Sequence, residues 1–188
     1  LRFGLHLRLD EELRSTVHTP TVADASEVPD PIVELIATAE GPSLSSWMLE
    51  RGTIDHLREF AVHRSPYQLK EADPHSTAIA RLPAGWAKTA LLDIQVDEYG
   101  PEPNEAHARL FAETMDALGL PGAAGPDLDR VPAPTLLTNT LLGLGASSRR
   151  LLGALVGHLA VFEMCSVEPM ARYAATVRRA LPGPEGTR

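Results

Sequence analysis

The chain has 188 residues, of which 44% are hydrophobic and 22% are charged, close to the average of a soluble globular protein. Its net charge of −8 argues against a protein that coats nucleic acid, since binding to phosphates requires clustered positive charge. The single cysteine, Cys165, excludes an intrachain disulfide and a thiolate metal cage, and it fits a reducing, cytoplasmic compartment. We expect no membrane contact, because no uninterrupted apolar stretch approaches the ~18 residues of a membrane span and no signal peptide is visible.

Helical periodicity extends through nearly the whole chain, and alternation of β-branched residues is scarce. The 16 prolines fall mostly between periodic segments and divide the chain into pieces of helical length. Leu1–Arg14 is compatible with a helix, and Thr16–Asp30 resembles a loop. The pattern predicts helices over residues 31–39, 43–50, 53–64, 66–72, 84–99, 103–118, 134–144, 147–165 and 168–181. We expect an all-α protein with one domain over residues 1–188; two looser helical lobes are the alternative.

Three polar residues lie on apolar stripes of the predicted helices. Glu98 ends one stripe, His107 opens the next, and Glu163 lies four residues after Leu159 on a third. A buried ionised carboxylate costs several kcal/mol unless it is paired or bound to a metal. Helical bundles build carboxylate–histidine di-iron sites from facing helices, and these ligands suit iron, manganese or zinc. Spacing alone leaves a metal site and solvated or core side chains equally open.

A second polar cluster spans His63–His75 and contains two histidines, two acids and two bases. It is either a solvated helix end before Pro74 or one wall of a site, in which Lys70 pairs with a neighbouring acid or with a substrate carboxylate. His158 is interpreted as a core residue or as support for a site, and Cys165 as a small buried hydrophobe. The sequence contains no phosphate loop, dinucleotide fingerprint, His-Glu-x-x-His motif or nucleophile elbow.

Three segments together resemble the iron-containing redox enzymes of the haem-oxygenase-like fold, the haem-oxygenase-like di-iron oxidases. The resemblance covers roughly residues 42–179, and no single segment would be specific. The first segment is Leu57-Arg58-Glu59-Phe60 with His63-Arg64-Ser65 and Tyr67-Gln68-Leu69-Lys70-Glu71-Ala72-Asp73-Pro74-His75. The second is Asp97-Glu98-Tyr99-Gly100 with His107-Ala108-Arg109-Leu110-Phe111, and the third is Gly157-His158-Leu159-Ala160-Val161-Phe162-Glu163.

The resemblance implies a set of iron ligands. In that family they come from a Glu in a Glu-Tyr/Leu-Gly turn, a His about ten residues later, a Glu in a Phe-Glu segment, and a late His-x-x-x-Asp-x-x-His helix. By position these fall on Glu98, His107 and Glu163, and Glu71 corresponds to a further carboxylate that some members have. The spacing from Glu98 to His107 is one residue short of the common one. Residues 1–188 contain no late His/Asp/His motif, so we expect that helix beyond Arg188.

The resemblance also implies a haem-oxygenase-like helical bundle and a function. It indicates an O₂-dependent non-haem oxidase or oxygenase that uses Fe(II), with two irons. The implied substrate is a small amine, guanidine or amino-acid-like metabolite of a biosynthetic pathway, with N-oxygenation favoured over oxidative C–C cleavage. An external electron donor is expected, and a homodimer is one expected assembly. The alternatives are a metal-free small-molecule-binding or thiaminase-like protein, in which Cys165 would act, and a catalytically silent partner protein.

Overall fold

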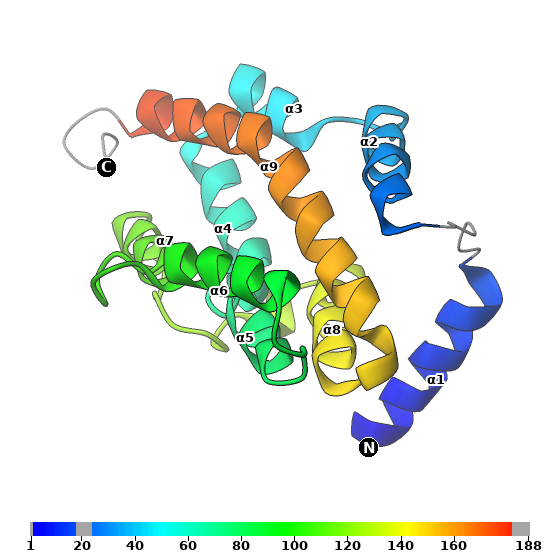
Figure 1. Ribbon diagram of the computed structural model, residues 1–188. Coiled ribbons are helices and arrows are strands. Elements are labelled where there is room, and N and C mark those ends of the chain that lie inside the picture. The colour runs from blue at the N-terminus through cyan, green and yellow to red at the C-terminus, as the bar shows by residue number, and fades with distance from the viewer. Residues whose placement is uncertain (1, 18–23, 182–188) are drawn as a thin grey trace.

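The computed structural model describes residues 2–17 and 24–181, and over these ranges the chain forms helices and turns without any strand. The all-α fold expected from the sequence is therefore confirmed. Figure 1 shows α4 in the middle of the molecule, with α9 crossing beside it and α1 at the edge. The described α-helices are α1 (Arg2–Thr16), α2 (Pro29–Ala37), α3 (Leu44–Arg51), α4 (Ile54–Gln68), α5 (Asp73–Ile79), α6 (Trp86–Tyr99), α7 (His107–Ala117), α8 (Ala133–Ser147) and α9 (Leu152–Ala180).

Two predicted helix breaks were wrong, because α4 continues through Pro66 and α9 through Pro169. A proline inside a helix leaves the carbonyl four residues earlier without its usual N–H donor. In α4 that carbonyl belongs to Val62, and it accepts a hydrogen bond of 2.9 Å from the Ser65 hydroxyl instead. In α9 the helix bends along its length (Figure 1), as helices that contain proline do. Helix α4 therefore reaches Gln68 without interruption.

Two clusters of buried side chains hold the helices together, and α4 contributes to both. One cluster joins α3, α4 and α7, and the other joins α4, α5, α8 and α9. A capping box at Thr53 and His56, in which each side chain accepts from the other's backbone N–H, fixes the start of α4. Helix α4 is therefore packed along its first half by one cluster and near its C-terminal end by the other. The cluster residues are Met48, Leu57, Ala61, Met115 and Leu118 in the first, and Tyr67, Ala78, Leu142, Ala146 and Leu155 in the second.

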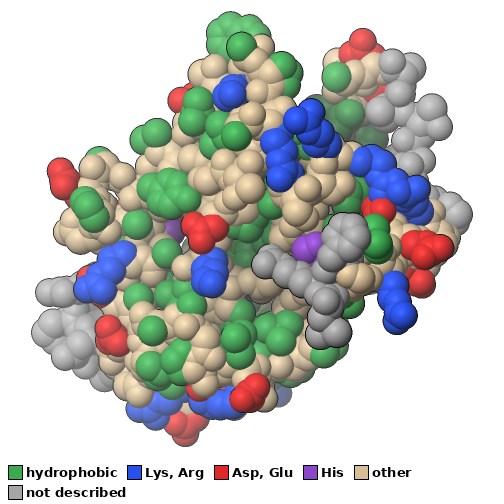
Figure 2. Space-filling view, turned by 90° about the horizontal axis from the view of Figure 1, so that it is seen from below, with side chains coloured by type: hydrophobic (Ala, Val, Ile, Leu, Met, Phe, Trp, Pro, Cys, Tyr) green, Lys and Arg blue, Asp and Glu red, His purple; other side chains and the backbone are tan. Residues whose placement is uncertain are grey.

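Helix α9 is unusually exposed for an apolar helix. The stretch Arg149–Ala180 is long and apolar enough to cross a membrane, judged by length and composition alone, with a mean hydropathy of 1.5 in an 18-residue window of which 11% is buried. A single such helix is weak support for a membrane span, because core helices of soluble proteins pass the same test. Figure 2 shows one face of the molecule, on which Lys and Arg side chains lie among acidic and hydrophobic ones and form no continuous basic surface.

Candidate metal centre

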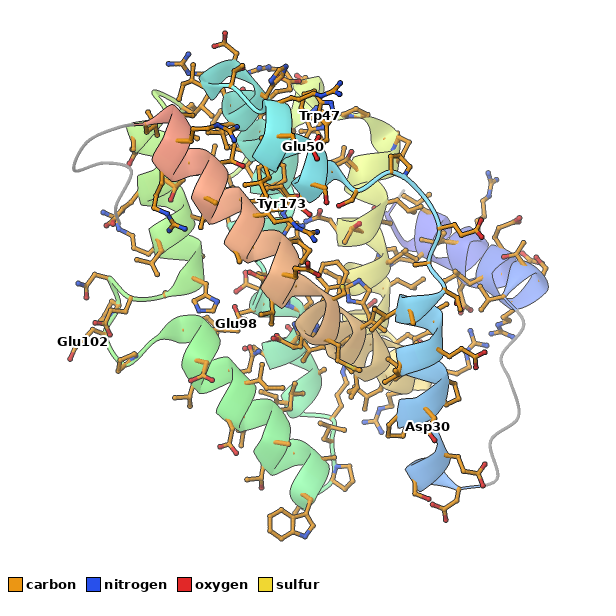
Figure 3. All side chains as sticks on the ribbon, turned by 90° about the horizontal axis from the view of Figure 1, so that it is seen from above. Asp30, Trp47, Glu50, Glu98, Glu102 and Tyr173 are labelled. Atoms are coloured by element: carbon orange, nitrogen blue, oxygen red, sulfur yellow. The ribbon has the colours of Figure 1, made fainter. Side chains whose placement is uncertain are left out.

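Three candidate ligands lie where the turn after α4, the end of α6 and the start of α7 meet. Glu71 is in the turn over residues 69–72 that separates α4 from α5. Glu98 is in the last turn of α6, and His107 is the first residue of α7. Figure 3 shows Glu98 at the end of α6, from which the chain passes through the outlying Glu102 into α7. Segments well separated in the sequence thus contribute one side chain each.

Gly100 allows the short loop between α6 and α7. Its φ of +70° lies in the left-handed region, and a Cβ at this position would approach the backbone carbon of Glu105 to 2.7 Å. Only glycine meets both conditions without strain, as at many helix C-termini. Because the chain turns back tightly at Gly100, His107 lies beside Glu98 despite the shortened spacing between them. The helix predicted from residue 103 therefore begins later, at His107.

The ligand atoms of these three residues form a compact group. One atom each from Glu71, Glu98 and His107 can be chosen so that all lie within 4.8 Å of one another. Two ligands on opposite sides of one ion stand about 4.2 Å apart when each bond is ~2.1 Å long. Small movements of the side chains would therefore bring all three ligand atoms within bonding distance of a single cation. Carboxylate and imidazole donors are those that iron, manganese and zinc accept.

One oxygen of Glu98 is buried without a hydrogen-bond partner in the described part of the chain. The Glu98 side chain is 11% exposed, and its Oε2 lies 3.1 Å from Nδ1 of His107. The two atoms are close enough for an ion pair, but their alignment is not that of a hydrogen bond, and Oε2 remains unsatisfied. A buried polar atom without a partner is costly. A cation between Glu98 and His107 would satisfy both, so the residues present fit a metal ion.

Burial and mutual repulsion make the metal-free group electrostatically unfavourable. Burial raises the pKa of Glu98, the charge of Glu71 raises it further, and the His107 imidazole opposes the rise. Burial also raises the pKa of Glu71, whereas contact with the Tyr67 hydroxyl and the charge of Arg64 lower it. Closely spaced carboxylates resist simultaneous ionisation unless a cation neutralises them. Both carboxyl groups therefore favour a bound cation over a shared anionic state.

Glu71 is oriented by two residues of α4 that the sequence analysis did not single out. The Gln68 side-chain amide donates a hydrogen bond to Oε2 of Glu71, and the Tyr67 hydroxyl lies against the same carboxylate. Arg64 in turn donates from Nη2 to Oε1 of Gln68, over 2.8 Å. Residues four apart on a helix are neighbours, so the spacing of Arg64 and Gln68 within α4 was a usable signal, whereas the contact of Gln68 with Glu71 depends on the turn after α4. Such supporting contacts fix the direction in which a ligand points.

Glu163 lies outside the compact group. It is exposed on α9, although its apolar stripe predicted a core position, because the described residues leave most of α9 uncovered. Its charge nevertheless raises the pKa of both Glu71 and Glu98, so it lies close enough to act on them. The structure thus brings three of the four predicted ligands together and places the fourth nearby. The ligand role of all four stays a prediction.

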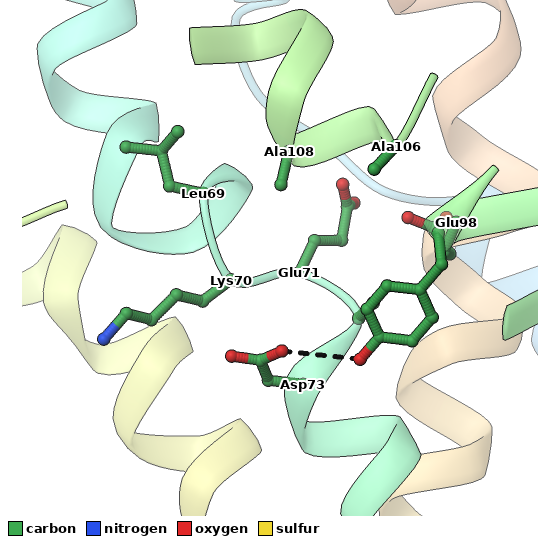
Figure 4. A pocket seen from close by; sticks show the side chains of 9 residues that line it. Leu69, Lys70, Glu71, Asp73, Glu98, Ala106 and Ala108 are labelled. Atoms are coloured by element: carbon green, nitrogen blue, oxygen red, sulfur yellow. Dashed lines mark hydrogen bonds between the residues drawn. The ribbon is translucent and has the colours of Figure 1, made fainter. Parts of the chain in front are cut away.

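The other residues of the polar cluster at 63–75 lie partly on the surface and partly in the core. Lys70 points away from the Glu71 carboxylate (Figure 4), and it forms no ion pair with a described residue, so the predicted pairing with an acid was wrong. Asp73 accepts a hydrogen bond from the Tyr99 hydroxyl over 3.4 Å. His75 is buried, and burial lowers its pKa. Only Glu71 of this cluster belongs to the ligand group.

Two further predictions concern α9. Cys165 was expected to be buried, but it is exposed, and its thiol donates a hydrogen bond to the Phe162 carbonyl over 3.7 Å. It lines neither of the two cavities that adjoin the ligand group. His158 stacks on the Phe162 ring, with centroids 4.3 Å apart, and burial lowers its pKa. His158 is therefore packed against Phe162, which agrees with its interpretation from the sequence as a core residue.

The raised pKa of Glu98 predicts a pH dependence for the stability of the metal-free protein. A carboxyl group with a higher pKa in the folded chain than its ordinary 4.5 holds more protons when folded, so its stabilising contribution is lost as pH rises through the raised value. Glutamine does not ionise. We therefore expect Glu98→Gln to gain thermal stability relative to wild type as pH rises from about 4.5 towards neutrality.

This comparison is made by thermal denaturation in the presence of a chelator. Glu102→Gln is the matched control, because Glu102 lies on the exposed loop that follows α6 (Figure 3). Its difference from wild type should stay constant over the same pH range. A constant difference for Glu98→Gln would contradict the raised pKa.

The described residues form helices without strands and bring together a compact carboxylate–histidine group. Both features are typical of the helical proteins that bind a first-row metal ion between their helices. Comparison with models of protein families narrows this class. The family model described as iron-containing redox enzyme matches residues 58–188, which is more than half of the chain. The chain therefore belongs to the family of iron-containing redox enzymes, with a haem-oxygenase-like fold. A search of curated proteins finds no match.

Proposed function

We propose that this protein is an O₂-dependent non-haem iron oxidase or oxygenase. The observation that carries the proposal is the group of Glu71, Glu98 and His107, whose ligand atoms lie within 4.8 Å of one another and which includes the unsatisfied Oε2 of Glu98. Membership of the iron-containing redox enzymes selects iron among the metals that such donors accept. Bound iron supplies the capacity to react with O₂, which protein side chains lack.

We propose that the centre holds two irons, with Glu163 as a fourth ligand. Three protein donors suffice for one non-haem iron, as in the two-histidine, one-carboxylate triad. A third carboxylate, that of Glu163, is close enough to raise the pKa of Glu71 and Glu98, and it supports a second cation. The roles of this chain's own residues follow from their positions. Gln68 and Tyr67 orient Glu71, and Glu98 contributes a carboxylate on a side chain that is 11% exposed.

The substrate we propose is a small amine, guanidine or amino-acid-like metabolite, with N-oxygenation favoured over oxidative C–C cleavage. We further propose a cytoplasmic protein without nucleic-acid or membrane partners, which forms a homodimer. Electrons would come from an external donor, because a chain with one cysteine has no dithiol of its own to supply them. The exposed position of Cys165, outside both cavities, lends no support to a cysteine-dependent hydrolase.

The test is an anaerobic titration with Fe(II), followed by exposure to O₂. We expect saturable binding of two irons per chain, measured by a chelator assay and by Mössbauer spectroscopy. The bound iron should then be oxidised by O₂ faster than free Fe(II) in the same buffer. Absence of saturable Fe(II) binding would contradict the proposal. Bound iron that O₂ oxidises no faster than free iron would also contradict it. One tightly bound iron per chain would overturn the di-iron part alone.

The substitution Glu163→Ala is expected to abolish iron-dependent oxidase activity without unfolding the protein. Glu163 is exposed and forms no ion pair with a described residue, so Glu163→Ala should change the free energy of unfolding by no more than about 0.5 kcal/mol. Loss of one negative charge beside Glu71 and Glu98 should also ease repulsion in the metal-free protein. The readouts are iron stoichiometry, activity and chemical denaturation.

Glu168→Ala is the control for that variant. Glu168 lies on the same helix, is exposed, and pairs with Arg172 four residues later. It should keep the iron stoichiometry of the wild type. Full activity in Glu163→Ala, or loss of its fold, would contradict the role assigned to Glu163.

A further inference from the structure

A cavity of about 320 Å³ opens beside the candidate metal centre, between α4, α7 and α9. Its size is at the lower end of the ~300–1,000 Å³ found for small-molecule sites. Most of its wall is apolar, and neither Glu71 nor Glu98 lines it. His107 does, so this candidate ligand borders both the cavity and the metal-binding group. The apolar walls are formed mainly by Phe60, Leu110, Phe111 and Met170.

Arg64 is the one permanently charged residue that lines this cavity. It is half-buried, and no carboxylate in the described chain lies within 4 Å of its guanidinium. Nη2 donates to Gln68, and the guanidinium carbon lies 5.1 Å from the centre of the Tyr67 ring. These two contacts hold the guanidinium in place and leave further N–H donors without an acceptor on the described chain. The charge of Arg64 lowers the pKa of Glu71, but Glu71 is linked to Arg64 through Gln68 and does not line the cavity. On the cavity side the guanidinium therefore lies among apolar side chains without an anion, an arrangement that an anionic ligand would stabilise.

We propose that this cavity binds a small organic acid, whose carboxylate is held by Arg64 and whose apolar body lies between Phe60, Phe111 and Met170. The inference rests on the proposed function, since it names the class of molecule that would be held beside the iron centre. Among the proposed substrates, this cavity would favour amino-acid-like molecules that carry a carboxylate. Arg64 would be the residue that determines this specificity.

The chemistry of the cavity favours a carboxylate over other charged groups. The planar fork of an arginine matches the two oxygens of a carboxylate. A phosphate monoester carries close to two negative charges, and the cavity offers one arginine within apolar walls. An amine without an acid group would meet the Arg64 charge with no carboxylate among the lining residues. The carboxylate end therefore belongs at Arg64, and the opposite end of the molecule lies towards His107.

The test compares three ligands of one shape: phenylbutanoate, phenylbutanamide and phenylbutylamine. Affinities are measured by titration calorimetry on the metal-free protein and on the anaerobic Fe(II) protein. We expect wild type to bind the acid roughly 10- to 100-fold more tightly than the amide, the range for hydrogen bonds between charged groups. Arg64→Met should remove this preference while amide binding stays unchanged. Arg64→Lys keeps the charge without the fork, so it should retain part of the preference.

Arg109→Met is the matched control. Arg109 lies on α7, is exposed, pairs with Glu113 and does not line the cavity. It removes the same charge from the same region, so it should leave the preference for the acid intact. Thermal denaturation of each variant checks that it folds, and the comparison of acid with amide in wild type needs no variant.

Several outcomes would overturn the proposal. These are equal binding of acid and amide by wild type, tightest binding of the amine, and a preference for the acid that survives Arg64→Met. A preference that appears only with Fe(II) and is independent of Arg64 would mean that the acid binds iron directly. Failure of the proposed function is a separate result, because it appears as absent Fe(II) binding, while acid selectivity is measured on the metal-free protein.

Discussion

Glu98→Gln is expected to lower the affinity for Fe(II) by at least about 100-fold and to abolish O₂-dependent turnover. Loss of contacts that merely support a metal ligand already costs ~10–100-fold in affinity. The Glu98 side chain is 11% exposed, against 47% for His107, and its unsatisfied Oε2 lies 3.1 Å from Nδ1 of His107. An amide at this position is neutral and offers one weaker oxygen donor. The affinity is measured by anaerobic titration and the turnover by O₂ consumption.

The same variant should be more stable than wild type without metal at neutral pH, since one of the mutually repelling carboxylates is gone. Weaker iron binding together with higher metal-free stability distinguishes a metal ligand from a residue that holds the fold. Glu102→Gln should change neither quantity. Iron affinity equal to that of wild type in Glu98→Gln would remove Glu98 from the centre, and loss of the fold would show a structural role instead.

Met115→Ala is expected to destabilise the protein by about 2–5 kcal/mol, the usual cost of truncating a buried methionine side chain to alanine. The Met115 side chain is 0% exposed and packs in the cluster that joins α3, α4 and α7. Because α7 carries His107 at its first residue, looser packing of α7 should also weaken Fe(II) binding. The effect on binding should be smaller than that of Glu98→Gln, since every ligand is retained. Chemical denaturation and anaerobic titration measure the two effects.

Met164→Ala is the control for that substitution, because it makes the same chemical change on α9 at a side chain that is 49% exposed. Surface substitutions of this kind usually change stability by no more than about 0.5 kcal/mol. Met115→Ala with an equally small effect would mean that the site collapses around the smaller side chain, contrary to the packing described here.

Much of the fold was predictable because helical periodicity is a local property. The apolar spacing, the scarcity of β-branched alternation and the placement of prolines predicted an all-α chain. The errors arose where tertiary contacts override a local signal. Pro66 does not end α4, because Ser65 supplies the missing hydrogen bond to Val62 and the second cluster packs around Tyr67. Helix α9 likewise extends past Pro169, and beyond this proline Tyr173 and Val177 pack against the first cluster.

The candidate ligands were predictable in part, because each carries a signal of its own. Glu98, His107 and Glu163 interrupt apolar stripes, and the motifs around them resemble a known family. Glu71 came only from that resemblance. The role of Gln68 and Tyr67 in orienting Glu71 was not predicted, because it depends on the turn that follows α4 and on the direction in which their side chains point.

The sequence by itself determined the helical class, the chemical types of the candidate ligands and the family to which the chain belongs. Residue types and their spacing along the chain suffice for these. Only the tertiary structure decided that Glu71, Glu98 and His107 approach within 4.8 Å, that Glu163 is exposed, and that Arg64 faces an apolar cavity. Such properties depend on how α4, α6 and α7 pack and on the tight turn at Gly100. Distances between segments far apart in a chain are set by that packing, and no local pattern encodes them.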